Sequence, residues 1–260
     1  MKRVFCLLIV TFFLVCSFAQ NKTIASGETL SYTVSYNMSG LLTELAQVTM
    51  ETSEVKTSKS TFLRLKLKAN TYSKWDNFFR IDDLYESYVS PNSLKPYLYK
   101  REINEGSYFK FMQYNFNHKN GTIKSLKRKR RKDGTFWNEK KNISINNNTR
   151  DLVTTFYHIR NLDIEKAKIG DSEVFKVFFD NKESEVKITL LAIETIKTKL
   201  GKKECYKLAI SLNDSDLLQG KNNNLLWLTA DANKILVYAK FKVAVGNGEL
   251  RIQNATGLKH

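Results

Sequence analysis

Apolar and polar residues alternate with a period of two through most of the chain. Between positions 29 and 36, Leu30, Tyr32, Val34 and Tyr36 alternate with threonine and serine. This period is typical of β-strands that bury one face. The same alternation recurs at positions 63–69, 174–179, 186–196, 226–228 and 235–245. The chain is therefore predicted to consist mainly of β-strands.

Turn signals separate these runs, including Asn120-Gly121 and Asp133-Gly134. Many strands joined by short turns predict a sandwich, a barrel or a strongly curved sheet. We expect an antiparallel curved sheet, half-barrel or barrel-like sandwich of roughly 11–14 strands. No clear domain boundary interrupts positions 20–260, so this region is predicted to be a single β domain.

One segment, at positions 151–162, has a helical period instead. Leu152, Phe156 and Ile159 fall on one helical face, and Thr149 or Asp151 could cap the start. We predict one helix of about three turns here. A shorter helical or irregular piece is expected at positions 72–79. The Asn-rich positions 140–150 are interpreted as a loop before the helix.

The first 19 residues have the layout of a secretory signal. Lys2 and Arg3 precede an almost unbroken apolar run at positions 4–15, and small residues Ser17 and Ala19 follow. The run is shorter than the roughly 20 residues that a membrane span needs. We expect cleavage near Ala19 and export, rather than a retained anchor. Lipidation of Cys16 fits poorly, because bulky Val15 precedes it.

Loss of the signal would leave Cys205 as the last cysteine, so no intramolecular disulfide is expected. Cys205 lies in strand-like sequence and is interpreted as a small buried apolar residue. The three histidines, at positions 118, 158 and 260, are far apart in sequence and match no metal motif. We therefore expect no metal and no cofactor.

Catalytic motifs are weak. Ser53-x-x-Lys56 and Ser184-x-x-Lys187 match a nucleophile pattern, but strand-like sequence would place Ser and Lys on opposite faces. Asp82, Asp83 and Glu86 form a carboxylate cluster that could carry out acid–base chemistry. Ion pairing with nearby Lys or Arg is the preferred interpretation. An envelope glycan or lipid hydrolase is thus the last of three hypotheses, and no enzyme activity is expected.

The most distinctive local feature of the sequence is a run of six cationic residues, which directly precedes the turn at Asp133-Gly134. The run comprises Lys127, Arg128, Lys129, Arg130, Arg131 and Lys132. Export argues against a nucleic-acid partner. On a projecting hairpin these charges would be either a solvated arm or a contact for an anionic membrane or envelope polymer. Docking through this hairpin, as a scaffold protein, is the second hypothesis.

Aromatic residues are abundant, and most should be ordinary core. Our candidates for a ligand site are Trp75, Phe79, Tyr85, Tyr114 and Trp227. A curved sheet lined with such side chains could enclose a hydrophobic ligand, although a filled core fits the sequence as well. The first hypothesis is therefore a non-enzymatic, monomeric envelope protein that binds a hydrophobic or lipid-like ligand.

Several short patterns resemble one known family over nearly the whole mature chain. They are Gly27-Glu28-x-Leu30-x-Tyr32-x-Val34-x-Tyr36, Asp83-x-Tyr85-Glu86-Ser87-Tyr88, Pro96, Arg101-x-Ile103-Asn104-Glu105-Gly106, Asp151-Leu152 with Phe156-Tyr157-x-x-Arg160, Glu194-Thr195-Ile196 with Gly201, and Leu226-Trp227-Leu228-Thr229-x-Asp231-x-Asn233. The chain resembles domain of unknown function 3108, which occurs in exported proteins of Gram-negative bacteria. One departure is Leu236, where proline is expected.

The resemblance implies a periplasmic or envelope-associated antiparallel β protein. It implies no agreed activity and no catalytic residues. By architecture such proteins are similar to half-barrels that move lipids or lipoproteins across the periplasm, which is an analogy of fold alone.

Overall fold

A computed structural model describes residues 20–38, 41–75, 78–213, 224–243 and 246–260. The expected signal peptide, 1–19, lies outside these residues. The described strands form a single 15-stranded sheet in the order β8-β7-β6-β5-β4-β3-β2-β1-β15-β14-β13-β12-β11-β10-β9. The predicted curved β fold is confirmed. The strand count exceeds the expected upper bound by one, and β9 (Arg150–Asp151) has only two residues.

The N-terminal half of the sheet has eight strands. They are β1 (Thr29–Met38), β2 (Leu41–Lys56), β3 (Thr61–Thr71), β4 (Asp82–Val89), β5 (Pro96–Glu105), β6 (Tyr108–Asn117), β7 (Thr122–Arg130) and β8 (Phe136–Ser144). The C-terminal half contains β10 (Ser172–Phe179), β11 (Lys182–Thr198), β12 (Gly201–Leu212), β13 (Leu225–Thr229), β14 (Leu236–Val243) and β15 (Gly246–Thr256).

Hairpins explain the strand order, because consecutive strands within each half pair antiparallel. The two halves join where the first strand pairs with the last, β1 with β15. Strand β9 is parallel to β10. The sheet does not close, since β8 and β9 each have one strand neighbour among the described residues.

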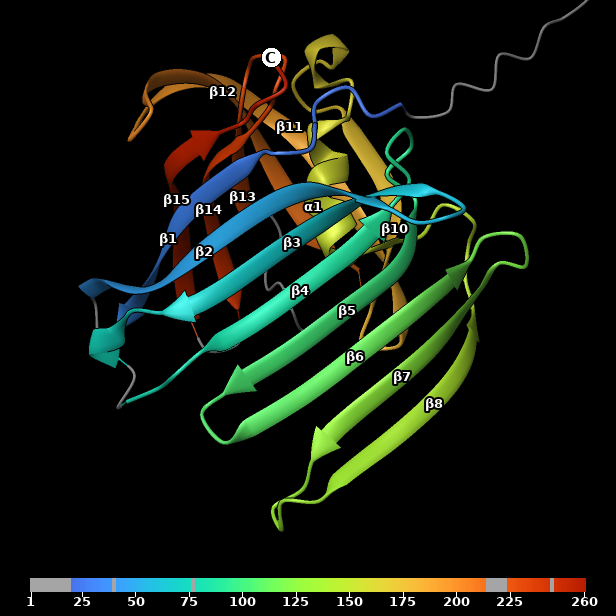
Figure 1. Cartoon of the computed structure of the whole chain (residues 1–260). Coiled ribbons are helices and arrows are strands. Elements are labelled where there is room, and N and C mark those ends of the chain that lie inside the picture. The colour runs from blue at the N-terminus through green and yellow to red at the C-terminus, as the bar shows by residue number, and fades with distance from the viewer. Residues whose placement is uncertain (1–19, 39–40, 76–77, 214–223, 244–245) are drawn as a thin grey trace, which may run out of the picture.

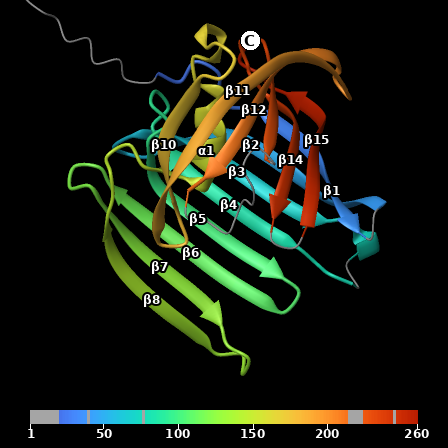
Figure 2. The same ribbon diagram turned by 180° about the vertical axis from the view of Figure 1, so that it is seen from behind.

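The sheet curls into two layers with a helix between them (Figures 1 and 2). Strands β2–β5 lie in front of α1 (Leu152–Arg160) in Figure 1, and β10–β12 lie behind it. Val153 and Tyr157 belong to one core cluster, with residues such as Tyr32. Ile159 belongs to a second cluster, built on β10–β14. The helix therefore fills the space between the layers with apolar side chains on two sides.

Both ends of α1 are tied to the sheet. At its start, the Asp151 carboxylate accepts a hydrogen bond from the Thr154 N–H at 2.8 Å and another from the Ser87 hydroxyl at 2.6 Å. Asp151, one of the two candidates from the sequence, is thus the cap. At its end, Arg160 forms a buried ion pair with Glu28, which directly precedes β1. These contacts fix the depth and the direction of the helix.

Other irregular segments agree in part with expectation. In the described part of the short helical piece predicted at 72–79, residues Ser73–Trp75 form a 3₁₀ turn, η1. Another 3₁₀ turn, η2 (Ile164–Lys166), follows α1. The loop predicted at 140–150 was wrong over 140–144, which belong to β8. Strand β8 is an edge strand with most side chains exposed, so burial imposes no alternation on its sequence.

Candidate functional site

An apolar cavity of about 330 Å³ lies between α1 and the two layers of the sheet. Its walls come from α1 and from eight strands. They are Val48, Met50, Leu67, Leu152, Thr155, Phe156, Val177, Phe179, Val186, Ile210, Leu212, Asn224, Leu226, Leu236, Ala239, Lys240, Phe241 and Leu250. Only three of these residues carry polar side chains. The cavity therefore offers apolar contact to a ligand and few hydrogen bonds.

Helix α1 forms one wall through Leu152 and Phe156, near its N-terminal end. This wall is placed by the cap described above, because Asp151 directly precedes Leu152 and is bonded to β4. Lys240, whose side chain is half exposed, is one of the lining residues. The site is thus an apolar cavity with one wall fixed by the helix cap.

Beside the cavity, the turn between β10 and β11 crosses the inner face of β5–β7. Asp180 in this turn accepts hydrogen bonds from Lys110, and it pairs with Arg101. The next residue, Asn181, accepts a hydrogen bond from the Ser125 hydroxyl at 2.6 Å. A polar cluster therefore lies next to the apolar cavity.

The five aromatic residues that we predicted for the ligand site do not line this cavity. Trp75 and Phe79 lie after β3, where Phe79 is exposed and the Trp75 indole N–H donates to the Glu44 carbonyl at 2.9 Å. Trp227 faces away from the cavity, since its neighbours Leu226 and Leu228 face inward. It lies beside an outer groove of about 850 Å³ and donates to Glu194 at 2.6 Å.

The other two candidates share the inner face of the N-terminal half. Tyr114 is fully buried between Tyr99, with ring centroids 5.3 Å apart, and Phe178, at 4.9 Å. Tyr85 is half-buried, and its hydroxyl donates to Asp83 at 3.3 Å. Burial raises the pKa of Tyr85 well above its ordinary value. Tyr114 is packed as a core residue, and Tyr85 as part of a polar network.

The residues that sequence reasoning missed are mostly aliphatic and come from both halves of the chain. Leu226, Ala239 and Leu250 lie on three adjacent strands, and their registers place them in one row. Alternation could have shown which face each strand buries. It could not show that β2 and β3 would face this row across a cavity.

The basic run is divided by the strand that carries it. Lys127 and Lys129 pair with Glu139 and Trp137 on the inner face of the sheet. Arg128 and Arg130 lie on the outer face, and Arg131 and Lys132 follow β7 in the turn to β8. The predicted projecting hairpin is present, but its six charges do not form one patch.

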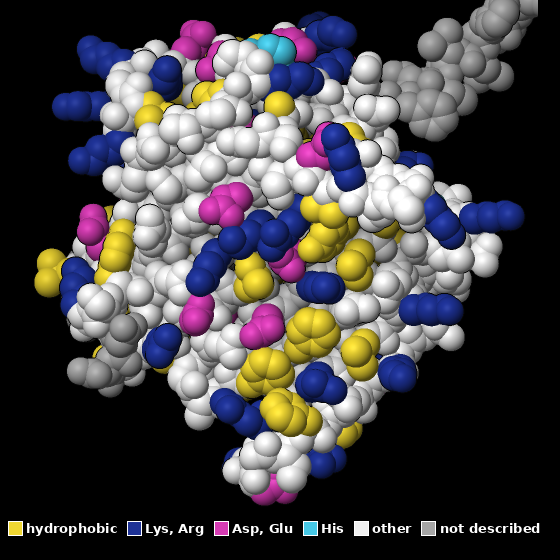
Figure 3. All heavy atoms as spheres, viewed as in Figure 1, with side chains coloured by type: hydrophobic (Ala, Val, Ile, Leu, Met, Phe, Trp, Pro, Cys, Tyr) yellow, Lys and Arg dark blue, Asp and Glu magenta, His cyan; other side chains and the backbone are white. Residues whose placement is uncertain are grey.

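The outer face of β6–β8 combines cations with aromatic rings. Arg128 lies 5.5 Å from the ring of Phe136, which contacts Phe109 edge to face at 5.7 Å. Figure 3, which shows this outer face, has hydrophobic side chains among Lys and Arg over the lower strands. Within 108–144, all of which the structure describes, the two acidic residues are Asp133 in the turn and Glu139 on the inner face. The outward side chains of these three strands are thus without a carboxylate.

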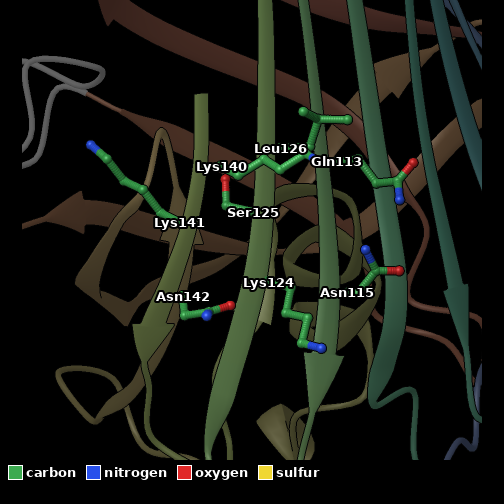
Figure 4. A pocket seen from close by; sticks show the side chains of 8 residues that line it. All are labelled: Gln113, Asn115, Lys124, Ser125, Leu126, Lys140, Lys141 and Asn142. Carbon is green, nitrogen blue, oxygen red and sulfur yellow. The ribbon is translucent and has the colours of Figure 1, made fainter. Parts of the chain in front are cut away.

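A shallow groove of about 440 Å³ continues this face along β6–β8 (Figure 4). It is lined by Gln113, Asn115, Lys124, Ser125, Leu126, Lys140, Lys141 and Asn142. Amide and ammonium groups therefore dominate it, and such groups suit an anionic or hydroxyl-rich surface.

The predicted carboxylate cluster is dispersed over both faces of β4. Glu86 lies outward and accepts from Arg64 Nε at 2.8 Å, and Asp82 accepts from Asn70 at 2.7 Å. Asp83 lies inward, where the Asn104 backbone N–H donates to it at 2.9 Å. Burial raises the pKa of Asp83 above its ordinary value. This dispersal argues against an acid–base pair.

Other candidate groups are held in structural positions. Cys205 is buried in β12, and burial raises the pKa of its thiol to about 11. The two Ser-x-x-Lys matches lie in β2 and β11, as strands rather than helix turns. Among the described residues, no three His, Cys, Asp or Glu side chains meet in a way that could hold a metal ion. No described helix has the length and apolar character of a membrane span.

Comparison with known families agrees with this architecture. The profile of a family described as "Protein of unknown function (DUF3108)" matches residues 31–253. The chain belongs to this family. Comparison with curated proteins found no match.

Two solved structures align with most of this chain at low sequence identity. The β-barrel-like protein of domain of unknown function DUF1849 from Brucella abortus aligns with a TM-score of 0.55 at 8% identity, over 90% of this chain and 98% of its own. A protein from Bacteroides fragilis, described as exported and of YmcC-like fold, aligns with a TM-score of 0.35 at 7% identity, over 91% and 99%. The first likeness supports the curved, barrel-like architecture and no particular activity.

Proposed function

We propose that this DUF3108 protein is exported to the bacterial envelope, where it binds a hydrophobic or lipid-like ligand without catalysing a reaction. The observation that carries the proposal is the apolar cavity beside α1, of about 330 Å³. Export rests on the signal-like sequence at positions 1–19, outside the described residues.

The size of the cavity sets the size of the ligand. An apolar cavity of about 150 Å³ is large enough to hold benzene, and ligand pockets begin near 300 Å³. The cavity is therefore suited to a single alkyl chain or a small ring system rather than to a two-chain lipid. Contact with aliphatic walls would supply most of the binding free energy, because burial of apolar surface is worth about 25 cal/mol per Å².

Binding of the neutral dye Nile red, followed by fluorescence, tests the cavity. Ala239→Phe fills it from the β14 side and should weaken dye binding at least about tenfold, whereas Leu226→Met keeps the volume of the wall and should bind normally. Native mass spectrometry of protein from its host should show a co-purified apolar molecule. Absence of both signals would remove the proposal.

A second candidate function is docking on an anionic lipid surface, and the carboxylate-free outer face of β6–β8 favours it. Cations near such a surface contribute about 1 kcal/mol each, and aromatic rings bind at the interface. Of the six residues in the basic run, Arg128 and Arg130 lie on this face, next to Phe109 and Phe136.

Liposome pelleting at low and high salt tests this second function and locates the contact. Arg128→Gln with Arg130→Gln should reduce binding to vesicles of phosphatidylglycerol. Lys127→Gln with Lys129→Gln removes the same charge from the inner face and is the matched control. Equal binding by both double variants would contradict an outer docking face.

A further inference from the structure

Two buried cations share one carboxylate beside the cavity. Arg101 and Lys110 are only 2% and 6% exposed, while the side chain of Asp180 is 45% exposed. The Lys110 ammonium donates to the two Asp180 oxygens at 2.5 and 2.8 Å, and the Arg101 guanidinium also donates to Asp180. The Arg101 Nε–H has no hydrogen-bond partner among the described residues. The pair therefore retains capacity for a second anion.

The surrounding charges leave this pair under-compensated. On the neighbouring strand β7, Lys129 pairs directly with Lys110, and Lys127 lies diagonally from Lys110 on the same face. Glu139, the cross-strand partner of Lys127, is paired with Lys141 at 2.9 Å. Burial is the main cause that lowers the pKa of Lys110, and Arg101 and Lys127 lower it further.

Asp83 is another carboxylate that acts on Arg101. It is occupied by the Asn104 N–H and the Tyr85 hydroxyl. Neither Asp83 nor Glu139 therefore replaces Asp180 as the direct partner of the two buried cations.

This cationic pair is one side chain away from the cavity. The Arg101 guanidinium lies 4.2 Å from the centroid of the Phe179 ring, and Phe179 lines the cavity. A chain held between the apolar walls could therefore place an anionic end at Arg101 and Lys110. Phe179 would separate the two environments.

Asp180 is presented to the cations by a tight hairpin turn between β10 and β11. Asp180 and Asn181 have φ values of 49° and 67°, in the left-handed region that asparagine and aspartate tolerate best. The Asn181 N–H and side chain are bonded to Tyr114 and Ser125. The turn thus holds a carboxylate where a ligand carboxylate or phosphate would make the same contacts.

We propose that the ligand of the cavity is a single-chain anionic amphiphile, whose carboxylate or phosphate binds Arg101 and Lys110 in competition with Asp180. This inference rests on the proposed function of the cavity. It adds the chemistry of the headgroup. It also adds Asp180 as an internal competitor, which the anionic headgroup has to displace from Arg101 and Lys110.

Calorimetric titration of the folded protein with dodecanoate, dodecyl phosphate and neutral dodecanol, all below their aggregation limits, tests the inference. Asp180→Asn keeps the shape and the left-handed turn but removes the competing charge. It should bind the anionic ligands about tenfold tighter than the wild type, the factor that one charge-assisted hydrogen bond supplies. Dodecanol binding should not change.

Two further variants complete the design. Asp133→Asn removes one negative charge from the other hairpin turn and should leave all affinities unchanged. Lys110→Met, which keeps the Arg101–Asp180 pair, should weaken the anionic ligands about tenfold and spare dodecanol. The tighter of the two anionic ligands identifies carboxylate or phosphate as the headgroup.

The outcomes separate the inference from the function on which it rests. If dodecanol binds and Asp180→Asn leaves anionic affinity unchanged, the headgroup site is overturned and the apolar cavity stands. If no ligand, dodecanol included, binds any variant, the cavity function itself fails.

Discussion

Arg160→Met is expected to destabilise the fold by about 3–5 kcal/mol, because it removes one partner of a buried ion pair. Arg160 and Glu28 are 3% and 1% exposed. Arg160 Nη1 and Nη2 donate to the two Glu28 oxygens at 2.6 and 2.7 Å. Its Nε and Nη2 also donate to the Asn233 carbonyl at 3.2 and 3.1 Å. Methionine retains an apolar stem but leaves the carboxylate without a cation.

The expected loss of about 3–5 kcal/mol follows because, without Arg160, the buried Glu28 carboxylate must either take up a proton or remain ionised without a partner. Each unit of pH above a reference value of about 4.3 adds about 1.36 kcal/mol to the cost of protonating a glutamate, so at pH 7 protonation costs about 3.7 kcal/mol. Remaining ionised in a buried site costs several kcal/mol as well. Loss of the hydrogen bonds to Asn233 adds about 1 kcal/mol. The double variant Glu28→Gln with Arg160→Met removes the orphaned charge and should be about 2 kcal/mol more stable than Arg160→Met alone.

Guanidinium unfolding at pH 7, followed by tryptophan fluorescence, measures these differences from midpoints at constant slope. Lys22→Met is the matched control, because it breaks the exposed pair with Asp163, 3.0 Å apart, and should cost less than about 1 kcal/mol. A double variant less stable than Arg160→Met would refute the reasoning, since it would show that the buried charge is not what costs stability.

Three further predictions concern single residues. Burial raises the pKa of Asp151 to about 6, above an unfolded value of about 3.9, so its contribution to stability grows as the pH falls through 6 and is complete below 3.9. The free energy of unfolding of the wild type minus that of Asp151→Asn should therefore rise by roughly 2 kcal/mol between pH 7 and pH 4, and a flat difference would contradict it. Buried Cys205 should react slowly with iodoacetamide at pH 8 and completely in denaturant, as measured by mass spectrometry; fast labelling of native protein would count against its burial. Gly257→Ala should cost about 1–3 kcal/mol in unfolding, because φ is +65° and the added Cβ would lie 2.1 Å from the Gly27 carbonyl oxygen; Gly106→Ala, with φ +55° and open space, should cost less.

Local patterns predicted the elements well because the period of the sequence reports which face is buried. Leu63 and Leu65 are buried in β3 as their alternation indicates, and Arg64 between them faces outward. The cap at Asp151 was equally readable, since a carboxylate before a helical period satisfies backbone N–H groups of the first turn. Each of these features depends on residues within a few positions of one another.

The cavity could not be predicted in the same way. Its lining depends on how far the sheet curves, and irregularities such as the register shift between Leu190 and Ala192 in β11 contribute to that curvature. Aromatic abundance led to Tyr114 and Trp227, yet the Tyr114 ring is packed between two other rings and Trp227 lies beside an outer groove. The space was left instead where shorter aliphatic side chains such as Ala239 face each other across the layers.

The period-two alternation of β-strands also applies to the basic run. The alternation of β7 continues into the run, so Lys127 and Lys129 had to point opposite to Arg128 and Arg130. Treating six adjacent charges as one patch ignores this rule. Arg128 and Arg130 on the outer face therefore belong to the proposed docking surface. Lys127 and Lys129 on the inner face lie near the Asp180 turn.

The polar residues that carry the family resemblance explain how such a cavity can be kept open. Glu28 and Arg160 fix the end of α1, and Ser87 and Asp151 fix its start, so the helix is tied to the sheet on both sides of the cavity wall. An empty apolar space tends to collapse, because unfilled volume forfeits dispersion contacts. Inward movement of α1, which carries Phe156, would disturb both attachments: breaking the buried ion pair costs about 3–5 kcal/mol and losing the hydrogen bond about 1–3 kcal/mol. The polar residues of the family resemblance therefore hold α1 in place, and the residues that line the cavity determine which ligand it accepts.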